Sequence, residues 1–124
     1  MDTPVNVLGT PLKSCSLDPL TGWYRDGCCN SDLRDRGSHT VCAQVTEDFL
    51  TFLQDKGNDL VTPAMQHGFP GLKPGDQWCV CAGSWYQAYR QGVACPVHLE
   101  STHQLALQHV PLEALMENAI AEEA

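Results

Sequence analysis

The sequence lacks a surplus of basic residues. It carries 7 Lys and Arg residues against 15 Asp and Glu residues in a chain of 124, which gives a formal net charge of −8 at pH 7. Proteins that bind nucleic acid or an anionic membrane surface need a basic footprint. The composition therefore predicts that neither a nucleic acid nor a membrane is the partner.

Long apolar runs and a targeting segment are also missing. No stretch approaches the roughly 20 apolar residues that span a bilayer, and the start, Met1 to Asn6, has neither the basic nor the apolar region of a signal peptide. We therefore expect a cytoplasmic protein, in which thiols stay reduced. The seven cysteines are also an odd number, so they cannot all pair with one another. Both the reducing compartment and the odd count therefore argue against a complete disulfide framework.

The apolar content is sufficient for one core. Hydrophobic residues make up 43% of the chain, close to the globular average, and no repeat or low-complexity tract divides it. A chain of this length buries a sizeable core without cross-links. We expect a single domain over residues 1–124, with the residues after about 120 frayed because Glu122 and Glu123 lie where the helix dipole disfavours negative charge.

Local patterns predict alternating strands and helices. A β-branched run predicts a strand over residues 39–45, and Thr46 is a good N-cap for a helix that Gly57 ends. A strand is expected over residues 78–81, followed by a helix that Ser84 caps and that ends near Gln91.

The last third of the chain continues the pattern. Alternating apolar and polar residues predict a strand over residues 96–100, Thr102 is expected to cap a short helix as far as His109, and Pro111 opens a terminal amphipathic helix. The elements together predict an α+β fold, a small and mostly antiparallel sheet with helices packed on one side in two layers.

Two stretches concentrate residues with chemical potential. Residues 15–40 are rich in turns, and a connection of that length without regular structure is usually functional when it is ordered. In the strand Trp78-Cys79-Val80-Cys81, alternation places Cys79 and Cys81 on one face and Trp78 and Val80 on the other.

Ordered motifs extend over most of the chain. They are Asn6-Val7-Leu8-Gly9, Asp18-Pro19-Leu20-Thr21-Gly22, Arg25-Asp26-Gly27-Cys28-Cys29, His39-Thr40-Val41-Cys42-Ala43, Gly57-Asn58-Asp59-Leu60, Phe69-Pro70-Gly71-Leu72 and Gly75-Asp76-Gln77-Trp78-Cys79-Val80-Cys81. With these motifs the chain resembles domain-of-unknown-function family number 2237, small and mostly bacterial proteins. The resemblance implies a small α+β domain and supplies no activity.

Our leading functional hypothesis is a site for a small polar or anionic ligand between residues 25–42 and 76–81. Its candidate ligand-binding residues combine directed polar groups with an aromatic wall, a usual mixture in small-molecule sites. They are Arg25, Asp26, Asn58, Asp59, Asp76 and Trp78.

The same region supplies candidates for a reactive thiol, because a nearby histidine can activate a cysteine. The candidate catalytic residues are Cys28, Cys29, His39, Cys42, Cys79 and Cys81, with Asp26, Asp59 or Asp76 to orient the imidazole. No Cys-x-x-Cys motif supports a thioredoxin-like cycle.

Two alternatives stay open. A structural zinc module would use His39, Cys42, Cys79 and Cys81, although the Cys-x-Cys spacing departs from the usual zinc knuckle; no cofactor is expected otherwise. The second alternative is a structural or protein-interaction domain whose cysteines are inert and buried, which is the commoner role of such residues.

Overall fold

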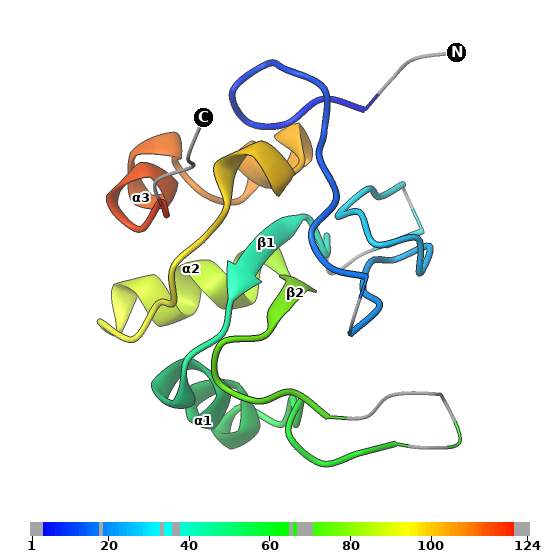
Figure 1. Ribbon diagram of the computed structural model, residues 1–124. Coiled ribbons are helices and arrows are strands. Elements are labelled where there is room, and N and C mark those ends of the chain that lie inside the picture. The colour runs from blue at the N-terminus through cyan, green and yellow to red at the C-terminus, as the bar shows by residue number, and fades with distance from the viewer. Residues whose placement is uncertain are drawn as a thin grey trace.

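The computed structural model describes residues 4–17, 19–32, 34–35, 38–64, 66 and 71–120, and the structural statements below concern these residues. The predicted fraying after residue 120 lies outside them. The helices and strands follow one another from the N-terminus as shown in Figure 1. They are β1 (Val41–Gln44), α1 (Glu47–Asp55), β2 (Gln77–Val80), α2 (Ala82–Arg90), the 3-10 helices η2 (Leu99–Ser101) and η3 (Gln104–Gln108), and α3 (Leu112–Glu117).

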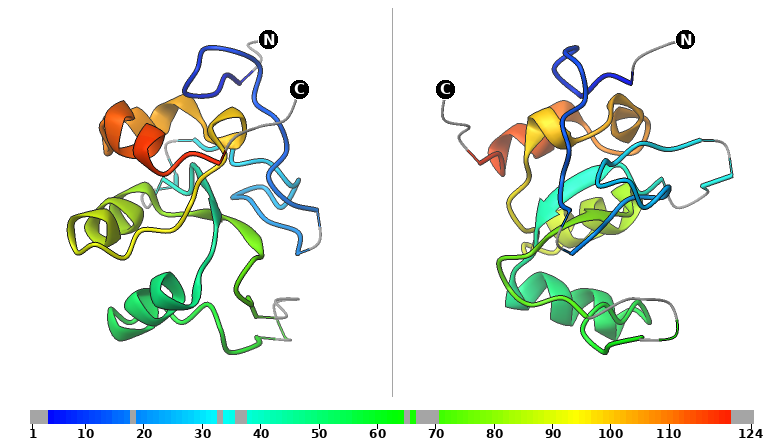
Figure 2. Two further views of the ribbon diagram at one scale, coloured as in Figure 1. Left: turned by 60° about the vertical axis from the view of Figure 1, so that its left-hand side comes forward. Right: turned by 45° about the vertical axis from the view of Figure 1, so that its right-hand side comes forward.

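The two strands form an antiparallel sheet, and the predicted α+β class is confirmed. Cys42 lies directly opposite Cys79, and Ala43 lies opposite Trp78. The three α-helices lie along one side of the sheet, whereas the long N-terminal loops lie along the other (Figures 1 and 2). None of the described helices is long and apolar enough to cross a membrane.

The sheet separates two buried clusters, as the alternation of strand side chains predicts. Val41, Ala43 and Val80 belong to the main hydrophobic core, in which Trp85 of α2 is the largest of the fully buried side chains. The opposite face contributes Cys42 and Cys79 to a separate cluster of sulfur atoms. The prediction for Cys81 is wrong, because β2 ends at Val80 and Cys81 is the N-cap of α2.

Helix α1 has the predicted boundaries. The hydroxyl of Thr46 accepts a hydrogen bond from the Phe49 backbone N–H at 3.2 Å, which satisfies one of the donors left unpaired at a helix start. Leu50 and Leu53 are buried on the face toward the core. Gly57 follows the helix with a φ of 92°, a conformation that glycine adopts without steric cost.

The last third of the chain differs from the prediction. In place of the strand over residues 96–100, Val97 makes only isolated bridges, to Ala43 and Ala119, before η2 begins. Thr102 does not cap the next helix: its hydroxyl donates to the His98 carbonyl at 2.9 Å and accepts the Cys42 N–H at 3.1 Å. The long-range bond to β1 thus takes the hydroxyl that the local pattern assigned to capping, and the ring of His103 caps η3 instead.

Candidate functional site

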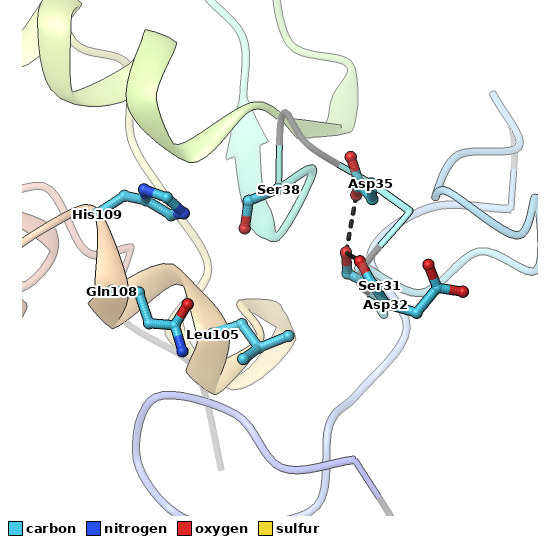
Figure 3. A pocket seen from close by; sticks show the side chains of 7 residues that line it. All are labelled: Ser31, Asp32, Asp35, Ser38, Leu105, Gln108 and His109. Carbon is cyan, nitrogen blue, oxygen red and sulfur yellow. Dashed lines mark hydrogen bonds between the residues drawn. The ribbon is translucent and has the colours of Figure 1, made fainter.

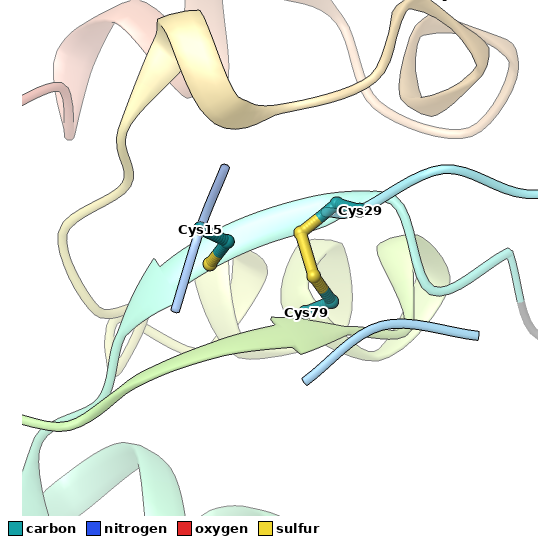
Figure 4. A group of neighbouring side chains, drawn as sticks. All are labelled: Cys15, Cys29 and Cys79. Atoms are coloured by element: carbon teal, nitrogen blue, oxygen red, sulfur yellow. A yellow bond between two sulfur atoms is a disulfide. The ribbon is translucent and has the colours of Figure 1, made fainter. Parts of the chain in front are cut away.

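Two disulfides fasten the turn-rich segment 15–40 to the sheet. Cys15 is bonded to Cys42 of β1 with Cα atoms 5.7 Å apart, and Cys29 is bonded to Cys79 of β2 with Cα atoms 5.3 Å apart. Between them, the hydroxyl of the buried Thr21 accepts the Cys79 N–H at 2.9 Å. Figure 4 shows the disulfide between Cys29 and Cys79 of β2, with Cys15 beside it in front of β1.

The expectation of fully reduced cysteines is therefore wrong for four of the seven. That expectation came from the inferred compartment and the odd cysteine count. Neither of these indicates which cysteines lie close enough to each other to form a disulfide. The cross-links suit a segment that lacks regular hydrogen-bonded structure, since they replace the ordering that a sheet or helix would supply. Three candidate nucleophiles, Cys29, Cys42 and Cys79, carry no free thiol in this state.

A cavity of about 400 Å³ lies beside the Cys29–Cys79 disulfide. Its walls come from the segment before β1, from the turn after α1 and from β2. They are formed by Trp23, Arg25, His39, Asp59, Leu60, Ala64, Trp78 and Cys79. The structure thus brings together five residues that the sequence analysis singled out, and we call this space the Arg25 cavity.

Arg25 reaches the cavity from an unusual backbone conformation. Its φ is 55°, in the left-handed region that non-glycine residues rarely adopt, and its N–H donates to the Gly22 carbonyl at 3.0 Å. The guanidinium carbon lies 5.2 Å from the centre of the Trp78 ring, within the range of a cation–π contact. No carboxylate pairs with Arg25 among the residues that the structure describes.

His39 is held by a carboxylate that the sequence analysis did not select. The buried Asp35 accepts the His39 backbone N–H at 2.8 Å and contacts its Nδ1 at 2.7 Å. Ser31 donates a third hydrogen bond to Asp35 at 2.8 Å. The expectation that Asp26, Asp59 or Asp76 orients the imidazole is wrong. The four-residue spacing from Asp35 to His39 was the one sequence feature that could have suggested this pair. It was not used because no helix is predicted there, so the spacing did not indicate that the two side chains are neighbours.

These contacts also set the charge state of Asp35. Burial raises the pKa of this carboxyl, but the hydrogen bonds from the His39 backbone, the His39 ring and Ser31 outweigh it and hold the pKa below its ordinary value. Trp23 stacks on the other side of the site, with its ring centre 6.3 Å from that of His39 and the planes 16° apart. Asp35 thus holds the edge of the imidazole, and Trp23 packs against its face.

The other predicted ligand-binding residues serve mainly in turns. Asp59 accepts the N–H groups of Val61 and Thr62 at 2.9 and 3.1 Å and the Thr62 hydroxyl at 2.6 Å, so its pKa is lowered. Asp26 accepts the Cys28 N–H at 3.0 Å, and Asp76 accepts the Lys73 N–H at 2.9 Å. Asn58 is exposed after the end of α1. Of this group only Asp59 lines the Arg25 cavity.

A second cavity, of about 390 Å³, lies on the far side of Asp35. Figure 3 shows Asp35 and Ser31 bonded to one another at one wall and His109 at the opposite wall. Asp32, also in the lining, is bonded to Arg34 and to the Tyr24 hydroxyl. Because its carboxylates already have partners, we regard this cavity as the weaker candidate for a ligand site.

The free cysteines are Cys28, Cys81 and Cys95. Burial raises the pKa of the Cys95 thiol to about 12. Burial and the neighbouring Asp26 raise the pKa of Cys28. Since the thiolate is the reacting form, neither environment activates its cysteine.

Native alkylation should report these environments. We expect iodoacetamide at pH 8 to modify Cys95 at least about 100-fold more slowly than an unfolded cysteine, since each pKa unit lowers the thiolate fraction about tenfold. Peptide mass spectrometry after timed quenching measures this, with the urea-unfolded protein as the reference. Fast labelling of Cys95 would contradict the burial described here.

The zinc alternative drawn from the sequence does not match the geometry. His39 is bonded to Asp35, and Cys81 begins α2, whereas Cys42 and Cys79 join Cys15 and Cys29. In the part of the chain that the structure describes, the group with metal-binding spacing is Cys15, Cys29 and Cys79. Cys15 was not among the candidate residues selected from the sequence.

Fold and cavity together define a small α+β domain in which a disulfide-anchored loop closes a cleft against the sheet. The chain belongs to a family of uncharacterised proteins conserved in bacteria, DUF2237, whose sequence model matches residues 5–119. No curated protein matches the chain. The family supplies no activity, so a functional proposal depends on the site itself.

Proposed function

We propose that this domain binds a small planar anion, such as an aromatic carboxylate, in the Arg25 cavity. The observation that carries the proposal is the placement of Arg25. Its guanidinium lies over the Trp78 ring and has no carboxylate partner among the described residues. A guanidinium offers paired N–H donors that match a carboxylate, and stacking on an aromatic ring leaves those edge donors available.

The shape and walls of the cavity support a ligand of this kind. A volume of about 400 Å³ falls in the range of small-molecule sites, which are mostly apolar with a few directed polar groups. Trp23 and Trp78 provide flat apolar surfaces, and His39 adds a fixed imidazole. The planar walls favour a planar ligand over an aliphatic one.

The electrostatic setting supports an anion despite the negative net charge. Asp59 lines the same cavity, but three donors of its own turn already bind its carboxylate oxygens. Arg25 is the one permanently cationic side chain in the described lining. We therefore expect selectivity for a single negative charge over a polyanion, which the net charge of −8 repels.

A matched pair of probes tests the proposal. Nicotinate and nicotinamide share a ring and differ in charge, so only nicotinate should stabilise the protein. At ten times its dissociation constant a ligand adds about 1.4 kcal/mol to the free energy of unfolding. For a domain of this size that raises Tm by about 5 °C. Benzoate extends the panel to a second planar monoanion, and phenyl phosphate, which carries a charge of about −1.5 to −2 at pH 7, should bind more weakly.

Variants locate the effect. Arg25→Gln should abolish the thermal shift, whereas Arg90→Gln, an exposed arginine at the end of α2 outside the cavity lining, should keep it. Equal shifts with nicotinate and nicotinamide, or an unchanged shift in Arg25→Gln, would show that the guanidinium does not recognise the ligand. An absence of any shift across the panel would count against a planar anion.

We propose, as predicted from the sequence, that the protein is cytoplasmic. The three free cysteines, Cys28, Cys81 and Cys95, fit a reducing compartment, whereas the two disulfides fit an oxidising one. The reactive-thiol part of the hypothesis depends on the same redox state. Cys79, the one cysteine of the described lining, gains a thiol only after reduction.

A further inference from the structure

The four disulfide-bonded cysteines form one compact group. The sulfur atoms of Cys15, Cys29 and Cys79 lie within 4.8 Å of one another, and the sulfur of Cys42 is bonded to that of Cys15. The residues come from three parts of the chain, the loop segment 15–29, β1 and β2, and all four are buried. Figure 4 shows three of them converging on the sheet.

We propose that this group, once both disulfides are reduced, is a four-thiolate site for one zinc-type divalent metal ion. Tetrahedral zinc with Zn–S bonds of about 2.3 Å places neighbouring sulfurs about 3.8 Å apart. The sulfurs of Cys15, Cys29 and Cys79 already lie within 4.8 Å of one another, and the sulfur of Cys42 is bonded to that of Cys15. Once the S–S bonds are reduced, we expect rotation of the cysteine side chains to bring the four sulfurs to this spacing around an ion. The proposal does not rest on ligand binding in the Arg25 cavity, although Cys79 also lines that cavity.

The conversion balances with a dithiol as reductant. Two dithiol molecules reduce the two protein disulfides, each transferring two electrons and two protons, and become two cyclic disulfides. The four protein thiols then bind one divalent ion as thiolates and release four protons. In a reducing compartment such as the one predicted from the sequence, cellular dithiols and thiols supply the first step.

A neighbouring side chain can donate a hydrogen bond to one of the thiolates. The side-chain amide of Gln77 lies 3.9 Å from the Cys42 sulfur, and the two ends of an amide exchange places by rotation. An N–H of Gln77 then points to the Cys42 thiolate, the kind of outer contact that orients metal ligands. The pairing of β1 and β2 sets Cys42 directly opposite Cys79, so the sheet positions two of the four ligand residues.

This ligand set differs from the one that the sequence suggested. It keeps Cys42 and Cys79, and it replaces His39 and Cys81 with Cys15 and Cys29. His39 is committed to Asp35, and Cys81 is committed to the start of α2. The two sets give different proton counts, since a site with one neutral histidine releases about three protons and a four-thiol site releases about four.

Cobalt titration of the reduced protein tests the site. The full chain is reduced with dithiothreitol, freed of reductant without oxygen and titrated with Co²⁺ at pH 7. We expect one equivalent to bind with the absorption of thiolate-to-cobalt charge transfer and tetrahedral cobalt, and Zn²⁺ to displace it. Calorimetry in buffers of different ionisation enthalpy should count about four protons released.

Variants assign the ligands. The triple variant Cys28→Ser/Cys81→Ser/Cys95→Ser retains only the four grouped cysteines and should bind one equivalent with the same spectrum, and His39→Ala should do the same. Cys29→Ser should weaken binding by more than the roughly 10–100-fold that loss of an outer contact costs. Loss of binding in the triple variant, retention in Cys29→Ser, or reduced wild-type protein that binds no Co²⁺ would overturn the proposal. Circular dichroism of each variant serves as the control for folding.

Discussion

Replacing Cys29 and Cys79 together by serine should lower the free energy of unfolding of the oxidised protein by about 4 kcal/mol. The disulfide joins residues 50 positions apart, and closing a loop of that size removes about this much entropy from the unfolded chain at 25 °C. Small domains are stable by only about 5–15 kcal/mol in total. The double variant should therefore unfold at a much lower urea concentration.

Urea unfolding followed by circular dichroism measures the change. Cys28→Ser is the matched control, because it alters the adjacent residue, whose thiol is free. The control should stay within about 1 kcal/mol of the wild type, as most substitutions outside the core do. If the double variant and the control were equally stable, the Cys29–Cys79 bond would not anchor the loop.

The same variant should also lose the ligand site. Trp23 and Arg25 lie between the disulfide-bonded residues Cys15 and Cys29, and both line the cavity. Without the bond to Cys79 this segment keeps fewer contacts with β2, and the guanidinium is no longer fixed over Trp78. A nicotinate thermal shift that persists in the double variant would show that the cavity forms without the cross-link.

Asp35→Ala should produce the second large loss, about 3 kcal/mol of unfolding free energy. The carboxylate is fully buried and binds three donors: the His39 N–H, the His39 ring and the Ser31 hydroxyl. Hydrogen bonds to a charged group contribute about 1.5–3 kcal/mol each, and the exposed side of His39 regains water and offsets part of this. Asp32→Ala is the control, because Asp32 makes its ion pair at the surface, and its loss should be smaller.

The stability that Asp35 contributes should depend on pH in a defined direction. Its pKa is lower in the folded protein than its ordinary value, so the contribution is fully present above the unfolded pKa of about 3.9. It is lost as the pH falls below that value and through the lower folded pKa. The stability gap between wild type and Asp35→Ala should therefore narrow on acidification below pH 4. A gap that widened there would contradict an ionised Asp35.

The middle of the fold could be predicted from the sequence because its signals are local. Thr46, the acidic first turn and Gly57 mark α1 through contacts within a few residues. The alternation of Trp78, Cys79 and Val80 likewise predicts two different faces of one strand. The prediction for the last third of the chain was wrong because the Thr102 hydroxyl accepts a hydrogen bond from the backbone N–H of Cys42, sixty residues away. No local sequence pattern contains that contact.

The candidate site was predictable only in part for the same reason. Arg25, Asp59 and Trp78 were selected by residue type, and the structure places them around one cavity. Asp35 was missed because its partner Ser31 and the His39 backbone define it only after the loop has folded. The pairing of Cys15 with Cys42 depends on the path of the loop across the sheet, which spacing alone does not determine.

The most direct test of the ligand-binding account is a nicotinate titration followed by the NMR signals of the three tryptophan indole N–H groups. Trp23 and Trp78 line the Arg25 cavity, whereas Trp85 is fully buried in the core and serves as an internal reference. The account predicts saturable shifts of the Trp23 and Trp78 signals, a constant Trp85 signal and no response in Arg25→Gln. Constant signals for all three tryptophans, or the same shifts in Arg25→Gln, would contradict it.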